Sequence, residues 1–207
     1  MKNRAAEVEF EAQLRERAQH LGVAVPPGIE SGLFRYVELL RRWNSTINLT
    51  ALPLDPLTAE SVDRLLLEPL AVAARLTTAE GPWFDLGSGG GSPAIPIKLA
   101  LPRLALTMVE SKERKGAFLR EAIRAIPLSG ATVENLRFAA LRERADFAGS
   151  AGLITVRAVR MDEEFLQLCR LLLRDRGVLA PVGFSGAELP GFELDEQTGF
   201  FYRQCST

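Results

Sequence analysis

Residues 84–96 read FDLGSGGGSPAIP: a short apolar run, then four glycines among positions 87–91, then two prolines. The apolar run is typical of a buried strand, and Pro93 stands where a helix commonly begins. Backbone N–H groups at a helix N-terminus bind polar groups of ligands, and glycine has no Cβ atom to keep a ligand away. The stretch therefore predicts a strand, a ligand-binding loop and a helix that begins near Pro93. A tight turn without any ligand is the alternative interpretation.

The pattern of apolar residues differs between the sequence before residue 81 and the sequence after residue 82. After residue 82, short apolar runs begin near positions 83, 104, 131, 152 and 177 and alternate with helix-like stretches, a pattern that favours a mostly parallel sheet. The runs GFELD and GFFYRQ near the end predict a closing antiparallel pair of strands. Before residue 81, apolar residues recur at helical spacing in three segments. We therefore expect an α/β fold, with a helical lobe over residues 1–80 and an α/β domain over residues 81–207.

Composition narrows the class of protein. The 207 residues are 47% hydrophobic, which suits a globular chain, and the formal net charge of -1 means that any nucleic-acid contact must come from a local basic patch. The two cysteines, Cys169 and Cys205, make neither a metal site nor a disulfide framework. The first residues lack the apolar core of a signal peptide, and no apolar run approaches the roughly 20 residues of a membrane span. We expect a cytoplasmic monomer without metal or membrane contacts.

The spacing of the loop selects among ligands. A dinucleotide fingerprint that starts at Gly87 needs a glycine at position 92, where the chain has Ser92, and the lysine of a phosphate-binding P-loop is also missing. The remaining pattern is D-x-G-x-G-x-G from Asp85, followed by Glu110 at the end of the next expected strand. An acid at that second position can accept hydrogen bonds from ribose hydroxyls. An acid at Asp85 suits a ligand that carries an ammonium group. Either carboxylate could instead be an ordinary acid at a strand end.

These motifs resemble motifs I and II of class I S-adenosylmethionine-dependent methyltransferases, which have a Rossmann-like sheet. Four blocks in order, LRRWNSTINLTAL at 40–52, DLGSGGGSPAIPIKLALP at 85–102, VESKERKGAFLREA at 109–122 and VRAV at 156–159, resemble the glucose-inhibited division protein B family. The resemblance extends over about residues 33–183. It implies a mostly parallel Rossmann-like sheet with an antiparallel last strand, S-adenosyl-L-methionine as cofactor, and ribosomal RNA or the small ribosomal subunit as partner. The implied reaction is methylation of guanine N7 in 16S ribosomal RNA.

The resemblance also implies roles for individual residues. Arg157, just after the fourth expected strand, matches the arginine where cofactor and RNA meet, and we take it as the catalytic candidate. A surface salt bridge is its alternative role. The basic clusters near the expected strand ends, together with a stacking face on Trp43, suggest RNA contacts, although the block around Trp43 could instead fasten the helical lobe to the sheet. The cofactor candidates are Asp85, Gly87, Ser88, Gly89, Gly91, Glu110, Leu136 and Arg157, and the RNA candidates are Arg41, Arg42, Trp43, Lys112 and Arg160.

Some positions depart from the family pattern. Leu65 replaces a histidine, Pro69 a serine and Val182 a lysine, while Ala94 stands where the family prefers glycine. Most of these changes fall on the expected RNA side, so the resemblance identifies the methyl acceptor less firmly than the cofactor. A methyltransferase of the same fold acting on another RNA or a small molecule therefore remains open. The sequence is also compatible with a non-catalytic RNA-binding or ribosome-assembly module and, more remotely, with a nicotinamide oxidoreductase.

Overall fold

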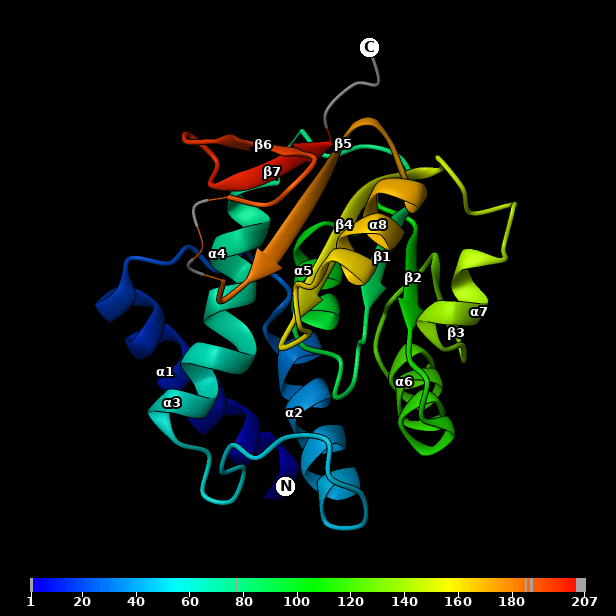
Figure 1. Cartoon of the computed structure of the whole chain (residues 1–207). Helices are drawn as coiled ribbons and strands as arrows, with labels where there is room; N and C mark the ends of the chain where they lie inside the picture. The colour runs from blue at the N-terminus through cyan, green and yellow to red at the C-terminus, as the bar shows by residue number, and fades with distance from the viewer. Residues whose placement is uncertain (1, 77, 185, 187, 204–207) are drawn as a thin grey trace.

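A single seven-stranded sheet organises the protein (Figure 1). The computed structural model describes residues 2–76, 78–184, 186 and 188–203. The strand order is β3-β2-β1-β4-β5-β7-β6, in which β1 to β5 are parallel and β7 runs antiparallel to both of its neighbours. The strands are β1 (Trp83–Leu86), β2 (Leu106–Val109), β3 (Ala131–Glu134), β4 (Ala151–Arg157), β5 (Leu173–Val182), β6 (Phe192–Asp195) and β7 (Phe200–Arg203).

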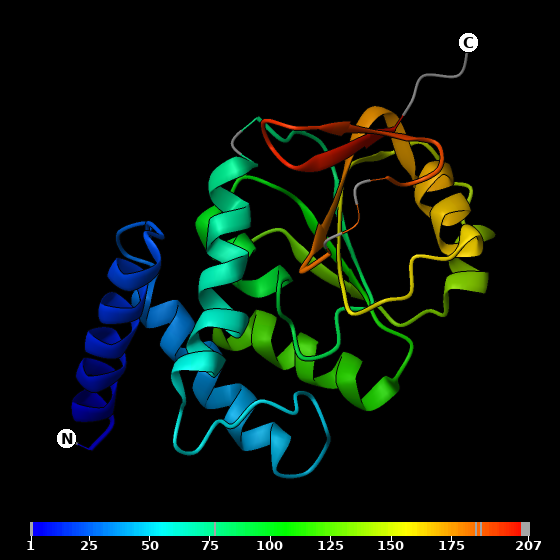
Figure 2. The same ribbon diagram turned by 60° about the vertical axis from the view of Figure 1, so that its left-hand side comes forward.

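Helices precede the sheet and connect its parallel strands. Figure 2 shows α1, in blue, as the element farthest from the sheet, with α2 between it and the strands. The last of the three helical segments expected before residue 81 runs as α3, a π-helical turn η1 and α4. The helices are α1 (Lys2–Leu21), α2 (Glu30–Asn44), α3 (Ala59–Val62), η1 (Asp63–Leu67), α4 (Glu68–Arg75), α5 (Ala94–Ala100), α6 (Glu113–Ala125), α7 (Phe138–Arg142) and α8 (Glu163–Leu172).

The alternation of side chains along the strands separates two hydrophobic clusters. Trp83 in β1 and Leu153 in β4 belong to the cluster that contains residues of α2, α4, α5 and α6. Phe84 and Ile154, one position later in each strand, belong to the cluster with α7 and α8. Because successive side chains of a strand point to opposite faces, helices cover both sides of the sheet. The result is a three-layer α/β/α arrangement.

The predicted strands and the closing antiparallel pair are confirmed, with one difference at β5. This strand begins at Leu173 rather than near 177, since Leu173 pairs with Ala151 before the register shifts. Residues 174–176 of this early part are exposed and polar, so hydrophobic patterning could not reveal them. Cys169 is a buried free thiol in α8, and Cys205 lies outside the described residues. None of the described helices combines the length and the apolar character that a membrane crossing requires.

Of the helices before residue 81, α4 packs against β5 and α2 against α5 and α6, whereas α1 packs against α2 and α3. Residues of α2 and α4 share one hydrophobic cluster with α5 and with the strand residue Trp83. The boundary at residue 80 between a lobe and a domain stays a prediction.

Candidate active site

The glycine loop connects β1 to α5 at the carboxyl end of the parallel strands. Its first two amides, of Gly87 and Ser88, donate to the Val109 carbonyl at 2.9 and 3.0 Å. Gly87 and Gly89 have φ of +78° and +52°, a region that residues with a Cβ atom rarely occupy. A Cβ atom on Gly90 would lie 2.9 Å from the Leu49 carbonyl oxygen. Gly90 is therefore a site residue that the sequence patterns did not single out, and close backbone approach is the reason that it must be glycine.

The segment around residues 44–52 covers this loop. The Asn44 side chain accepts hydrogen bonds from the amides of Leu49 and Thr50, at 2.8 and 3.0 Å, and donates to the Thr50 carbonyl at 3.1 Å. These bonds hold the turn that brings the Leu49 carbonyl to Gly90. From α2, the fully buried Tyr36 donates its hydroxyl to the Gly90 carbonyl at 2.7 Å. The WN-x-x-INLT block thus has a structural role against the glycine loop.

Removing the Tyr36 hydroxyl tests this contact. We expect Tyr36→Phe to lower the free energy of unfolding by about 1–2 kcal/mol, because the buried Gly90 carbonyl would lose its hydrogen bond. Urea denaturation followed by circular dichroism measures the change. The matched control is Tyr202→Phe, whose half-buried hydroxyl has no hydrogen bond to any residue that the structure describes. Equal stability losses for the two variants would contradict the role of this bond.

A cavity of about 510 Å³ opens between the glycine loop, α2 and the end of β4. Its size falls within the range of small-molecule sites. Residues from six separate stretches of the chain meet there. Three of these stretches follow β1, β2 and β4, whose carboxyl ends lie at the same end of the parallel sheet. The lining residues are Tyr36, Leu40, Leu49, Thr50, Ala51, Leu52, Arg64, Leu65, Gly87, Ser88, Gly89, Gly90, Ser92, Glu110, Lys115, Arg157, Ala158 and Val159.

Glu110, just after β2, presents a fixed carboxylate to this cavity. Its Oε2 atom accepts the Gly89 amide at 2.9 Å, and its Oε1 atom accepts the Lys112 amide at 2.7 Å. The residue is only 7% exposed. Each carboxylate oxygen has two acceptor positions, so both oxygens keep capacity for a ligand hydroxyl.

Asp85 is buried behind the loop, near the end of β1. Its Oδ1 atom accepts the Thr155 hydroxyl at 2.6 Å, whereas its Oδ2 atom has no hydrogen-bond partner among the residues that the structure describes. Burial raises the pKa of Asp85 to about 6, against the opposing effects of the hydrogen bonds from Thr155 and Ser88 and the charge of Arg157. A buried carboxylate oxygen without a partner is costly, and it marks this position as a place for a ligand donor.

Arg157, the last residue of β4, is held by residues from two other elements. Its Nη2 atom forms an ion pair with Glu68 Oε2 at 2.9 Å, and its Nη1 atom donates to Ser92 Oγ at 3.3 Å and to the Arg64 carbonyl. Ser92 in turn donates to the Leu65 carbonyl at 2.9 Å. Burial lowers the pKa of Arg157, and the nearby Glu68 opposes this shift. Glu68 is not among the site residues predicted from the sequence.

The other candidate residues lie in differing surroundings. Arg41 bonds to the Leu54 carbonyl and to Glu38, while Arg42 and the indole N–H of Trp43 both contact Glu121 of α6. Trp43 also packs edge-on against Phe118 at 6.0 Å between ring centroids. The exposed RNA candidates are Arg42 in α2, Lys112 before α6 and Arg160 after β4. The cofactor candidates outside the cavity lining are Asp85, Gly91 and Leu136, which packs near α7.

All four residues that depart from the family pattern are buried in the structure. Val182 pairs with Arg157 across β4 and β5 and is buried in the hydrophobic cluster. Leu65, Pro69 and Ala94 are buried as well, so none of these side chains offers a polar group to the cavity.

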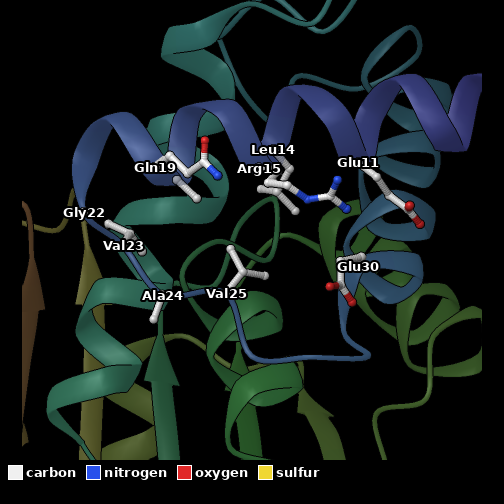
Figure 3. Close-up of a pocket in the computed structure, with 10 residues that line it drawn as sticks. Glu11, Leu14, Arg15, Gln19, Gly22, Val23, Ala24, Val25 and Glu30 are labelled. Atoms are coloured by element: carbon white, nitrogen blue, oxygen red, sulfur yellow. The ribbon is translucent and has the colours of Figure 1, made fainter.

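A second cavity, of about 440 Å³, lies between α1 and the segment that joins it to α2 (Figure 3). Leu14, Val23 and Val25 contribute apolar surface, and Glu11 and Arg15 stand at its edge (Figure 3). It shares no lining residue with the glycine-loop cavity. Within the described part of the chain, no three His, Cys, Asp or Glu residues are grouped to hold a metal ion.

The part of the chain that forms the glycine-loop cavity also matches known proteins in sequence. A family model described as rRNA small subunit methyltransferase G matches residues 29–183, which include the whole glycine-loop cavity. The chain belongs to this family. It is 41% identical over 174 residues to the ribosomal RNA small subunit methyltransferase G of Stenotrophomonas maltophilia (strain K279a), covering 80% of this chain and 77% of that protein. The protein of that name from Burkholderia thailandensis is 34% identical over 198 residues, covering 94% and 81%.

Solved structures agree on the fold of this family member. A Klebsiella pneumoniae protein described as an O-methyltransferase superposes with a TM-score of 0.58 at 11% identity, covering 97% of this chain and all of that one. A Staphylococcus aureus protein described as a caffeoyl-CoA O-methyltransferase gives a TM-score of 0.51 at 11% identity, covering 70% and 65%. The Rossmann-like methyltransferase fold implied by the sequence motifs is therefore confirmed.

Proposed function

We propose that this chain is an S-adenosylmethionine-dependent methyltransferase that methylates N7 of a guanosine in 16S ribosomal RNA. Membership of the rRNA small subunit methyltransferase G family carries the proposal, and the matched relatives are covered over about four fifths of their length. A substrate of this kind fits a cytoplasmic protein, and we propose that it acts as a monomer.

The residues of the cavity suit S-adenosylmethionine. A Cβ atom on Gly89 would meet only the Gly87 carbonyl, at 3.7 Å, so the space beside this glycine is open for a ligand. Glu110 would accept the ribose hydroxyls. Asp85 lies behind the lining, and its Oδ2 atom, which has no hydrogen-bond partner among the described residues, would accept the ammonium group. Gly87, Ser88 and Gly91 would shape the loop around the methionine part, with Leu136 at the adenine.

The chemistry requires no general base. S-adenosylmethionine supplies a methyl group on a sulfonium, and guanine N7 has an in-plane lone pair with no proton to remove. In the cavity lining, Tyr36 donates its hydroxyl to Gly90, and both Glu110 oxygens accept an amide while keeping capacity for ligand hydroxyls. Burial raises the pKa of Tyr36, which keeps its phenol neutral. Alignment of the two reactants, which can contribute roughly 7–11 kcal/mol, would then supply most of the rate.

Arg157 is the residue proposed to act where cofactor and guanosine meet. A guanidinium has five N–H donors, and three are engaged by Arg64, Ser92 and Glu68. Two donors remain for acceptors in the cavity that Arg157 lines. For RNA phosphates, the exposed Lys112 and Arg160 are available, and we propose that Arg41, Arg42 and Trp43 border the same RNA surface.

Substitution of Glu110 tests the cofactor site. We expect Glu110→Ala to weaken S-adenosylhomocysteine binding by about 10- to 100-fold, because a charge-assisted hydrogen bond contributes roughly 1.5–3 kcal/mol. Glu110→Gln should be milder, since an amide oxygen still accepts one hydrogen bond. Isothermal titration calorimetry measures both affinities. Glu113→Gln, an exposed acid on the first turn of α6, is the matched control and should bind like the wild type.

The deciding experiment identifies the acceptor. The protein is incubated with radiolabelled S-adenosylmethionine and small ribosomal subunits from cells that lack its gene, and the label is mapped by strand cleavage specific for N7-methylguanosine. We expect label at one guanosine of the small-subunit RNA. Label on an exocyclic amine, or on a small molecule alone, would contradict the proposed acceptor. Cofactor binding without transfer to any RNA would direct attention to the departures at Leu65, Pro69 and Val182.

A further inference from the structure

Two adjacent strands place a chain of polar groups on one face of the sheet. Trp83 and Asp85 alternate along β1, and their register partners in β4 are Leu153 and Thr155. Because residues two apart share a face, Trp83, Asp85 and Thr155 point into the same layer. All three are at most 1% exposed, although Asp85 and Thr155 are polar.

The hydrogen bonds of this cluster have only one possible direction. The Trp83 indole Nε1–H lies 2.8 Å from Thr155 Oγ1, and an indole nitrogen can only donate. Thr155 Oγ1 therefore accepts this bond and is left with its single hydrogen, which it donates to Asp85 Oδ1 at 2.6 Å. Asp85 Oδ1 is thus the acceptor end of a relay that starts at Trp83.

The relay leaves the other oxygen of Asp85 for a ligand. Oδ2 has no hydrogen-bond partner within the described structure. The Ser88 hydroxyl, which donates to the Asp85 backbone carbonyl at 2.9 Å, also acts on the carboxyl, as do the charge of Arg157 and the phenol of Tyr36. These three residues line the cavity, and Asp85 lies buried behind them. The carboxylate cannot rotate toward another partner for Oδ2 without losing the Thr155 hydrogen bond, so this bond favours one direction of Oδ2. A donor that carries positive charge would complete this arrangement.

We propose that Thr155 is a positioning residue that orients the Asp85 carboxylate so that Oδ2 receives the ammonium group of the cofactor. The inference rests on the proposed function, because it concerns the amino-acid part of S-adenosylmethionine. Thr155 itself touches Asp85 and Trp83 and acts only through Asp85.

Two ligands, one with and one without the amino-acid part that carries the ammonium group, test the proposal. S-adenosylhomocysteine carries the amino-acid part, and 5′-methylthioadenosine has the same adenosine without it. We expect Thr155→Val to weaken S-adenosylhomocysteine binding at least tenfold and to leave methylthioadenosine binding within twofold, as measured by calorimetry. Thr155→Ser, which keeps the hydroxyl, should bind both ligands within threefold of the wild type.

A matched control separates this effect from a general change in the sheet. Among the described residues, the Thr107 hydroxyl of β2 bonds to Thr132 of β3 and not to Asp85, so Thr107→Val should leave both affinities unchanged. Equal losses of both ligands in Thr155→Val would indicate loosened packing and would overturn the inference. Unchanged S-adenosylhomocysteine binding in Thr155→Val would overturn it as well.

A measurement without ligand tests the hydrogen bond from Thr155 to Asp85 independently of the proposed function. The carboxyl carbon of Asp85 can be followed by NMR over a pH titration. Loss of the Thr155 hydrogen bond should raise the Asp85 pKa in Thr155→Val but not in Thr155→Ser. If the wild-type protein binds neither ligand, the proposed function is contradicted. If the Asp85 pKa is unchanged in Thr155→Val, the proposed action of Thr155 on Asp85 is contradicted.

Discussion

Replacing Gly89 by valine is expected to abolish binding of S-adenosylhomocysteine, by at least 100-fold, while the protein still unfolds cooperatively. Gly89 has φ of +52°, and an added Cβ atom would meet only the Gly87 carbonyl at 3.7 Å. The two methyl groups of valine would therefore enter the glycine-loop cavity rather than clash with the fold. Their volume would occupy the space proposed for the cofactor. Calorimetric titration measures the affinity, and thermal denaturation measures the stability.

The matched control for this prediction is Gly149→Val. Gly149 is exposed, has φ of +63°, and has nothing within 4 Å of an added Cβ atom. Both variants place a side chain in the left-handed region, which costs roughly 1–2 kcal/mol per residue, but only Gly89 borders the cavity. Stability should fall in both, and binding only in Gly89→Val. A Gly89→Val protein that binds within a factor of about three, roughly 0.65 kcal/mol, would show that the loop is not the site.

Arg157→Ala is expected to lower kcat at least 100-fold while the affinity for S-adenosylhomocysteine changes less than fivefold. The two guanidinium donors left free by Arg64, Ser92 and Glu68 are proposed to act where cofactor and guanosine meet. An interaction that forms mainly in the transition state appears in kcat rather than in ground-state binding. Single-turnover methyl transfer to small ribosomal subunits and calorimetry measure the two quantities.

Two variants serve as controls for Arg157→Ala: one keeps the positive charge at this position, and one removes an arginine elsewhere. Arg157→Lys keeps a positive charge but cannot reach three acceptors with a planar fork, so it should recover only a small part of the rate. Arg174→Ala removes an exposed arginine near the start of β5, whereas Arg157 lies at the end of the neighbouring parallel strand β4. This variant should transfer methyl groups at the wild-type rate. If Arg157→Ala loses cofactor affinity and turnover to the same extent, Arg157 serves cofactor binding and not the transfer step.

The sheet could be predicted from the sequence because its signals are local. Apolar runs such as those around Trp83 and Ile154 identify buried strands, and helix-like stretches between them require parallel crossovers. The run of glycines from Gly87 identifies the loop, since left-handed backbone and close approach both favour glycine. Glu110 was recognisable because it follows the next strand at the edge where ligands bind in parallel sheets.

The partners of these residues were decided only by the tertiary structure. Tyr36 reaches Gly90 across 54 positions, Thr155 reaches Asp85 across 70, and Arg157 reaches Glu68 across 89. No local pattern carries such pairings, because they depend on which strands become neighbours and on how helices before the sheet lie over its edge. The order that places β4 beside β1 brings Thr155 to Asp85, and the packing of η1 and α4 brings Glu68 to Arg157. Hydrophobic patterning thus determined the layers of this protein, while the polar contacts that orient its site arose from long-range packing.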